Sequence, residues 1–135
     1  MFTYNVKVFY EDTDSGGVVY YANYLKFIER ARTNLIHQLS FSLNKLNLDF
    51  GVLFVVKRIE CDYLISAKLE DELLVKTNIL KVKNASFILE QNIERDTKLI
   101  FTSKVLMVCI DSNGKPKSIP LIVSKKMSEF YEKNI

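Results

Sequence analysis

Tryptophan is absent from this sequence, and glycine, proline and cysteine are scarce. Four glycines and two prolines among 135 residues exclude low-complexity and repeat architectures. The two cysteines, Cys61 and Cys109, stand in apolar or alternating stretches, which is the wrong pattern for a disulfide framework and too few thiols for a zinc site. We therefore expect two buried free thiols.

Long hydrophobic runs and a strong charge of one sign are also missing. The longest apolar runs, Val52–Val56 and Val105–Ile110, fall far short of the ~20 residues that cross a bilayer, and the N-terminus has no apolar signal segment. The net charge of +3 is modest and the basic residues are scattered, which argues against a nucleic-acid partner. With 48% hydrophobic residues, the chain is expected to form one cytoplasmic domain over residues 1–135.

What is present is a series of periodic segments that begins with a strand and a helix. From Phe2 to Tyr10 the even positions are apolar or aromatic, which predicts a half-buried strand. Acids and two glycines then indicate a loop over residues 11–17. From about Ala22 to Leu39, apolar side chains recur at helical spacing and predict one long helix that is buried on one face.

Four further strands are predicted after a connector, and a second helix closes the chain. The connector, from Ser40 to Gly51, is rich in Ser, Asn and Leu. Short polar separators between the strands are typical of hairpins, so we expect an antiparallel meander. A final helix should begin after Pro120, where helical spacing of apolar residues resumes. The four strands are expected at Val52–Ile65, Leu73–Lys83, Ser86–Arg95 and Leu99–Asp111.

This order of elements predicts an α+β fold. One long central helix would be wrapped by a curved antiparallel sheet of about five strands. A sheet that is covered on one face leaves edges to protect, so we expect the chain to form a homo-oligomer.

The loop between the first strand and the helix carries the acids Glu11, Asp12 and Asp14. The helix that follows starts with unsatisfied backbone N–H groups and a partial positive charge. A carboxylate can attack an acyl carbon or activate water, and those N–H groups can hold the oxyanion that forms. Asp14 is the best candidate because it lies nearest the glycines. A simpler interpretation stays open, in which the acids only cap the helix.

A calcium-binding loop is a second alternative, because Asp12 and Asp14 alternate ahead of Gly17. With Asp12 as the first position, however, position five is Gly16 and position twelve is Asn23, where a bidentate Glu is required. No helix is predicted before the loop either. These mismatches exclude an EF-hand.

The uninterrupted segment from Phe9 to Arg32, with Glu11–Gly17 at its centre, closely resembles the signature of the hotdog-fold acyl-CoA thioesterases. Within them it is most similar to the group associated with the bacterial Tol-Pal envelope system, a branch of the 4-hydroxybenzoyl-CoA thioesterase family. The resemblance continues less sharply through Phe54–Arg58 and Leu69–Leu73 and covers essentially the whole chain. It implies a hotdog fold.

The resemblance also implies an active site at a dimer interface. Asp14 would act as nucleophile or general base, and backbone N–H groups near Tyr21 would hold the carbonyl oxygen of the substrate. The expected substrate is an acyl-CoA, with acyl carrier protein as a further partner, in a homo-dimer or homo-tetramer. No separate cofactor or metal is expected, because the sequence has no Walker loop, Rossmann glycine pattern or zinc-ligand spacing, and coenzyme A enters as part of the substrate. A rival reading keeps the fold but makes the protein a non-catalytic module that binds an acyl carrier protein or an envelope partner.

One position departs from the pattern of that group. Its members commonly have a histidine where this chain has Tyr21, and the single histidine here, His37, lies late in the predicted helix. Because the reference pKa of tyrosine is ~10, Tyr21 cannot replace a histidine as a base near neutral pH. Only the backbone N–H at this position is therefore expected to contribute, and His37 is interpreted as a surface residue.

Substrate-binding residues are expected beside the acyl pocket and the mouth of the tunnel. Tyr10 matches a tyrosine near the acyl pocket of the family, although it is equally explained as an inward strand residue. Glu29 is interpreted as supporting the helix or loop, and is a secondary catalytic candidate. Basic residues near the mouth would meet the phosphates of coenzyme A. The strand residues that the family places along the tunnel are Val55, Lys57, Arg58, Lys81, Lys83 and Ser86.

Overall fold

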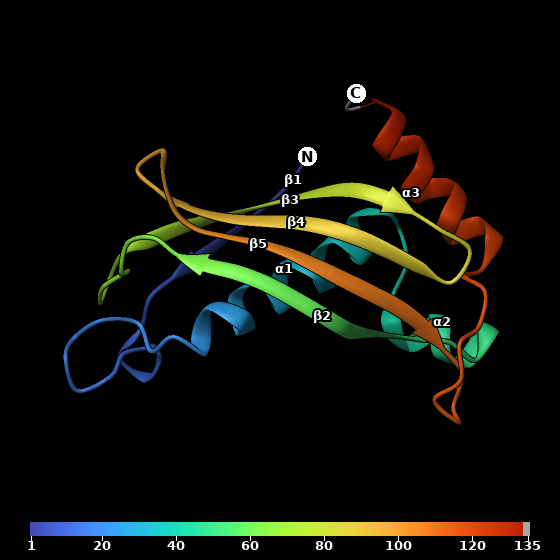
Figure 1. The fold of residues 1–135 in the computed structure, drawn as a ribbon, viewed down its shortest axis with the longest axis horizontal. Helices are drawn as coiled ribbons and strands as arrows, with labels where there is room; N and C mark the ends of the chain where they lie inside the picture. The colour runs from blue at the N-terminus through green and yellow to red at the C-terminus, as the bar shows by residue number, and fades with distance from the viewer. Residues whose placement is uncertain (134–135) are drawn as a thin grey trace.

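The structure is a computed structural model that describes residues 1–133. Its centre is a five-stranded antiparallel sheet, and helices cover one face of it (Figure 1). The strand order is β1-β3-β4-β5-β2. The strands are β1 (Phe2–Lys7), β2 (Leu53–Tyr63), β3 (Glu72–Val82), β4 (Ser86–Arg95) and β5 (Lys98–Ile110), and the helices are η1 (Tyr10–Asp12), α1 (Asn23–Gln38), α2 (Leu43–Phe50) and α3 (Leu121–Lys133).

The predicted strands are all present, but they do not form one meander. β3, β4 and β5 follow one another as hairpins, as expected. β2 instead pairs with β5 at the far edge, from Leu53 opposite Ile110 to Tyr63 opposite Phe101. The meander prediction is therefore wrong for β2. The segment that links β2 to β3 crosses the sheet instead of forming a hairpin. At the end of this segment, the N–H of Glu70 donates to Val8 O, next to β1.

Helix α1 packs along the sheet against β1 and β3, as Figure 1 shows. The predicted bounds Ala22 and Leu39 are the residues that flank the helix, so the periodicity located it to within one position at each end. Its buried stripe includes Phe27, Ile28 and Leu35. The helix does not cover this face alone, because α3 also packs against β3.

Helix α3 confirms the prediction of a C-terminal helix after Pro120. Val123 and Met127, one helical turn apart, are fully buried. Phe130 of the same helix stacks on Phe2 of β1 with ring centroids 3.8 Å apart. This contact covers the β1 edge of the sheet face on which the helices pack.

Helix α2 is a correction, since the segment from Ser40 to Gly51 was expected to be an irregular connector. Ser42 Oγ accepts the N–H of Lys45 at 3.0 Å and caps the start of the helix, and Gly51 ends it in the left-handed region at φ 66°. Leu46 anchors it in the core. A short helix with one buried residue shows little apolar periodicity, so the Ser and Gly caps were the signal to use.

The first strand is also shorter than predicted. It ends at Lys7, and Tyr10 begins the 3₁₀ turn η1 with 81% of its surface exposed. The Asp12 carboxylate accepts the N–H of Phe9 at 2.9 Å and closes this turn. Such local side-chain bonds compete with the hydrogen bonds of the strand ladder. This competition explains why the alternating sequence pattern continues beyond the end of the strand. Tyr10 is therefore not an inward strand residue.

The two thiols differ in their burial. Both cysteines are free, but only Cys109 is buried, whereas Cys61 on β2 is half-buried. The prediction of two buried thiols is correct for Cys109 alone. Within residues 1–133, no helix has both the length and the apolar character needed to span a membrane.

Candidate active site

Asp14 stands in a tight loop between η1 and α1. Its backbone N–H donates to Val18 O at 2.9 Å, and its Oδ1 accepts the N–H of Gly16 at 2.8 Å. Gly17 has φ 82°, a conformation that glycine adopts without strain. A Cβ on Gly16 would lie only 3.2 Å from Asp14 Oδ1. The two glycines thus allow the loop to close tightly around an exposed carboxylate.

Asp12, the neighbouring acid, ties this loop to the start of α1. Its carbonyl oxygen accepts both the N–H of Tyr20 and the side-chain amide of Asn23, each at 2.9 Å. The side chain is buried and bonds to Phe9, as described above. Asp12 therefore acts as a structural anchor, and Asp14 is left facing the solvent.

No acid of the loop caps α1. The cap residue is Ala22, which offers no side-chain acceptor, and the first turn of the helix contains no acid. The carboxylates of Asp12 and Asp14 bond to Phe9 and Gly16 instead. Among the hydrogen bonds of residues 1–133, none has the Tyr21 N–H as donor. The capping interpretation is therefore wrong, and the positive end of α1 is open to a ligand.

A cavity of about 320 Å³ adjoins this helix end, and we call it the Asp14 pocket. Asp14 and Tyr21 both line it, so the loop acid and the residue just before the N-cap of α1 share one cavity. The other walls are mainly aromatic and apolar. They are formed by Val18, Val19, Tyr20, Tyr24, Tyr63, Leu64, Ile65 and Ser66.

Tyr63, at the end of β2, closes one side of the Asp14 pocket. Its hydroxyl donates to the carbonyl oxygen of Tyr21 at 3.0 Å. Its ring packs edge-on against Tyr24 and Phe101, with centroids 5.2 Å away in both pairs. Burial raises the pKa of Tyr63 to about 12, with further contributions from the nearby Cys61, Tyr21 and Tyr24. The hydroxyl is therefore a permanent donor at neutral pH rather than a base.

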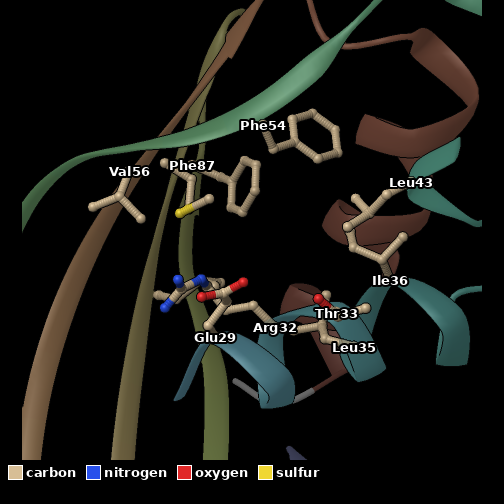
Figure 2. A pocket seen from close by; sticks show the side chains of 11 residues that line it. Glu29, Arg32, Thr33, Leu35, Ile36, Leu43, Phe54, Val56 and Phe87 are labelled. Carbon is tan, nitrogen blue, oxygen red and sulfur yellow. The ribbon is translucent and has the colours of Figure 1, made fainter. Parts of the chain in front are cut away.

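A second cavity, of about 230 Å³, lies between α1, α2 and the strands β2, β4 and β5, and we call it the Arg32 pocket. In the view of Figure 2, the head groups of Arg32 and Glu29, both on α1, overlap at one end of it. The remaining lining is mostly apolar. It consists of Thr33, Leu35, Ile36, Leu43, Phe54, Val56, Phe87, Leu89 and Met107.

A buried amide holds Arg32 in place. Arg32 Nη1 donates to Gln91 Oε1 at 3.0 Å. Gln91 is fully buried, and its Nε2 donates to both Ile28 O and Thr77 Oγ1 at 3.0 Å. Because the amide nitrogen has two acceptors, the amide oxygen must face Arg32. Desolvation lowers the pKa of Arg32, and the charge of Glu29 partly offsets that effect.

The predicted substrate-binding residues do not gather around Asp14 within one chain. Val55 and Ser86 each pair with Val108, on the sheet face away from α1. Lys57 lies at the bulge of β2, and Arg58 forms an ion pair with Glu60. None of the seven lines the Asp14 pocket, so their roles stay predictions. The seven are Tyr10, Val55, Lys57, Arg58, Lys81, Lys83 and Ser86.

The aromatic walls of the Asp14 pocket were not foreseen from the sequence. Tyr24 lies within the predicted helix, and its hydroxyl accepts the N–H of Ala67 at 2.9 Å. Tyr63 lies within the predicted strand Val52–Ile65. The sequence offered one indication of a role for Tyr63: it is an aromatic residue at the end of a strand whose outward-facing positions are polar. Only the fold, however, brings Tyr63 next to the loop that carries Asp14.

The remaining candidates lie elsewhere. His37 is exposed near the end of α1, as predicted. Glu29 lines the Arg32 pocket and not the Asp14 pocket. Over residues 1–133, no group of three or more His, Cys, Asp or Glu side chains is arranged to hold a metal ion.

Known proteins resemble this chain over most of its length. A family model described as the thioesterase-like superfamily matches residues 8–131. The acyl-CoA thioesterase YbgC of Haemophilus influenzae is 42% identical over 120 residues, which cover 88% of each chain. The acyl-CoA thioester hydrolase YbgC of Escherichia coli is 38% identical over 122 residues, which cover 89% of this chain and 90% of that protein.

The crystal structure of a probable thioesterase from Bartonella henselae has the same fold. It superposes with a TM-score of 0.83 at 32% identity, and the match covers 87% of this chain and 98% of that one.

Proposed function

The chain belongs to the thioesterase-like superfamily, and we propose that it hydrolyses acyl-CoA thioesters at the Asp14 pocket. One observation carries this proposal: Asp14 and Tyr21, the residue before the uncapped start of α1, line the same cavity. A carboxylate near unpaired N–H groups is suited to attack on a carbonyl whose oxygen becomes negative. The names of the YbgC relatives support the same activity.

In the proposed reaction, the thioester carbonyl oxygen accepts the N–H of Tyr21 at the start of α1. Asp14 either attacks the carbonyl carbon and forms an anhydride that water then cleaves, or removes a proton from the attacking water. By the first route, the C–S bond breaks as the anhydride forms and the sulfur leaves as a thiolate; water then cleaves the anhydride, which releases the acid and the Asp14 carboxylate, and one proton of that water ends on the thiolate. By the second route, Asp14 takes a proton from the attacking water and gives it to the sulfur as the C–S bond breaks, because Tyr63 stays protonated and no histidine lines the pocket.

We propose that the active form is a homo-oligomer joined through β2. This strand is the longer of the two sheet edges, 11 residues against 6 in β1. Leu53, Val55 and Val56 on it are each at least 36% exposed. Long apolar edges attract a further strand, and a second copy of β2 offers a matching one. The result would be a hotdog dimer in which the sheet wraps α1 as the central helix.

Pairing of two β2 strands in antiparallel fashion would also join the two pockets. Tyr63 of one copy would lie near Leu53 of the other when the strands overlap fully. The Asp14 pocket at one end of β2 would then adjoin the Arg32 pocket of the second copy, which contains Phe54 and Val56. The thioester would sit in the first pocket and the acyl group would extend into the second.

The test replaces Asp14 and measures turnover. We expect Asp14→Asn and Asp14→Ala to lower kcat for short, long and aromatic acyl-CoAs by at least about a hundredfold, as loss of a catalytic group does. Asp49→Asn, an exposed acid on α2, is the matched control and should keep full activity. Unchanged kcat in both Asp14 variants would refute the mechanism. Binding of acyl carrier protein without hydrolysis of any thioester would instead favour a binding module.

A further inference from the structure

The Arg32 pocket combines apolar walls with a charged group that is not fully paired. A guanidinium carries five N–H donors, and the one bond recorded for Arg32 in the described chain goes to Gln91. No ion pair within 4.0 Å joins Arg32 to Glu29 among these residues. No side-chain nitrogen or oxygen that is both fully buried and unpaired occurs in residues 1–133, so the other nitrogens of Arg32 are accessible to solvent.

This arrangement restricts which acyl groups can fill the pocket. A plain alkyl chain packed against the guanidinium would shield these nitrogens from solvent without offering an acceptor, which costs the desolvation of each unpaired donor. Arg32 cannot swing away without breaking its bond to Gln91, whose amide is itself held by Ile28 and Thr77. An occupant must therefore supply an oxygen acceptor next to Arg32.

The negative charge of Glu29 further restricts which functional group the acyl chain can place near Arg32. Glu29 lines the same cavity, and its negative charge acts on the Arg32 guanidinium. A second carboxylate would be attracted by Arg32 and repelled by Glu29. A hydroxyl accepts from Arg32 and donates to Glu29, so it satisfies both groups. The cavity of about 230 Å³ exceeds the roughly 150 Å³ that holds benzene, which leaves room for a short chain behind the hydroxyl.

We propose that the Arg32 pocket receives the far end of the acyl group and selects alkyl acyl chains that carry a hydroxyl there, with Arg32 and Glu29 as its hydrogen-bond partners. This inference rests on the proposed function. It makes Arg32 and Glu29 specificity-determining residues that take no part in breaking the thioester bond. Gln91 is the positioning residue behind them.

The first experiment compares matched substrates. Butyryl-, hexanoyl-, octanoyl- and decanoyl-CoA are each assayed with and without a terminal hydroxyl, and the terminally carboxylated analogues form a third series. At the chain length that reaches Arg32, we expect the hydroxylated substrate to have about tenfold or higher kcat/KM than its plain partner, because a site built for a hydroxyl rejects the analogue that lacks it. Equal or lower values for every hydroxylated substrate would overturn the proposal.

Two variants assign the effect to the pocket. Arg32→Met should abolish the preference for the hydroxyl, whereas Arg30→Met, an exposed cation on the same helix, should retain it. Glu29→Gln keeps the shape and removes the negative charge, so carboxylated substrates should gain at least about fivefold relative to hydroxylated ones. Because the Glu29 side chain forms no hydrogen bond or ion pair with any of residues 1–133, this variant tests the proposal even if Arg32→Met fails to fold. An unchanged ranking in Glu29→Gln would contradict it.

A binding measurement separates this proposal from the proposed function. Titration calorimetry with free alkyl acids, with and without the terminal hydroxyl, needs no catalysis and works equally in Asp14→Asn. Tighter binding of the hydroxylated acid that disappears in Arg32→Met supports the pocket even if no thioester is hydrolysed. Hydrolysis without any difference between the two acids would leave the enzyme activity standing and refute the selectivity.

Discussion

The hydroxyl of Tyr63 donates a hydrogen bond of 3.0 Å to the carbonyl oxygen of Tyr21, and so attaches the end of β2 to the start of α1. The peptide that receives this bond is the one whose N–H belongs to Ala22. The preceding peptide is held by a second bond, from Asn23 N–H to Tyr20 O at 2.8 Å. Two successive peptides at the positive end of α1 are thus oriented before any substrate arrives, which is what an oxyanion site requires.

Removal of the Tyr63 hydroxyl should weaken catalysis without abolishing it. In Tyr63→Phe the aromatic packing stays, but the peptide before Ala22 loses its anchor, so we expect kcat to fall by roughly threefold to tenfold with little change in KM. Steady-state assays with one acyl-CoA measure this. Tyr131→Phe, on the exposed side of α3, should behave as the parent. If kcat of Tyr63→Phe equals that of the parent, the Tyr63 hydroxyl does not contribute to catalysis.

The same hydroxyl should make stability depend on alkaline pH. The pKa of Tyr63 is about 12 in the folded chain against 10.0 for a free tyrosine. The stabilising difference is fully present below pH 10.0 and is lost as the pH rises through this interval, because the unfolded state loses the proton first. Urea unfolding at several pH values should show this decline in the parent. Tyr63→Phe should decline less steeply, and parallel curves would refute the assignment.

Gly17 should be needed for both stability and activity. Its φ of 82° lies in the left-handed region, so Gly17→Ala should cost about 1–2 kcal/mol of folding free energy and displace Asp14. Gly114 has φ 79° in a turn far along the chain, so Gly114→Ala is a matched control. We expect similar losses in denaturant midpoint for both variants, but a loss of kcat only for Gly17→Ala. Equal activity losses would mean that the effect is global.

Mixed oligomers can show whether the two pockets of one site come from different copies. Leu43→Trp should block the Arg32 pocket, which Leu43 lines, and Asp14→Asn should disable the carboxylate. Coexpression with two tags allows the mixed dimer to be purified. If the site is shared, one site carries both changes and the other carries neither, so about half of the parent activity should return in a symmetric dimer.

If instead both pockets of one chain form a site, each site of the mixed dimer is defective and no activity returns. Each variant by itself must be inactive on the substrate used, which is the internal control. Substrates with long acyl groups are the suitable choice, because they need the blocked pocket most.

Several elements could be predicted because their signal is local. The stripe of α1 located the helix to within one residue at each end, since a buried helix must repeat its apolar side chains every turn. The bounds of β4 from Ser86 to Arg95 matched for the same reason, with a period of two. Helix α2 was not predicted, because it has too few buried apolar residues to show a helical periodicity. Its capping residues, Ser42 and Gly51, were the only local signal.

The chemistry of the loop was harder to predict than its presence. Acids before a helix commonly cap it, and nothing local distinguishes that role from catalysis. The structure separates Asp12 from Asp14 by their burial and bonds: one anchors the loop, and the other stays exposed at a cavity. The resemblance pointed to Asp14 but carried no account of why Asp12 differs.

The sequence by itself determined the periodic elements, the acidic loop with its glycines, and the family to which the chain belongs. Tertiary structure alone decided that β2 pairs with β5, that Tyr63 reaches Tyr21, and that Arg32 faces an apolar cavity. The physical reason is the range of the interactions. Periodicity records which side of an element is buried, whereas the partner of a strand edge or of a buried amide such as Gln91 depends on how distant segments pack together.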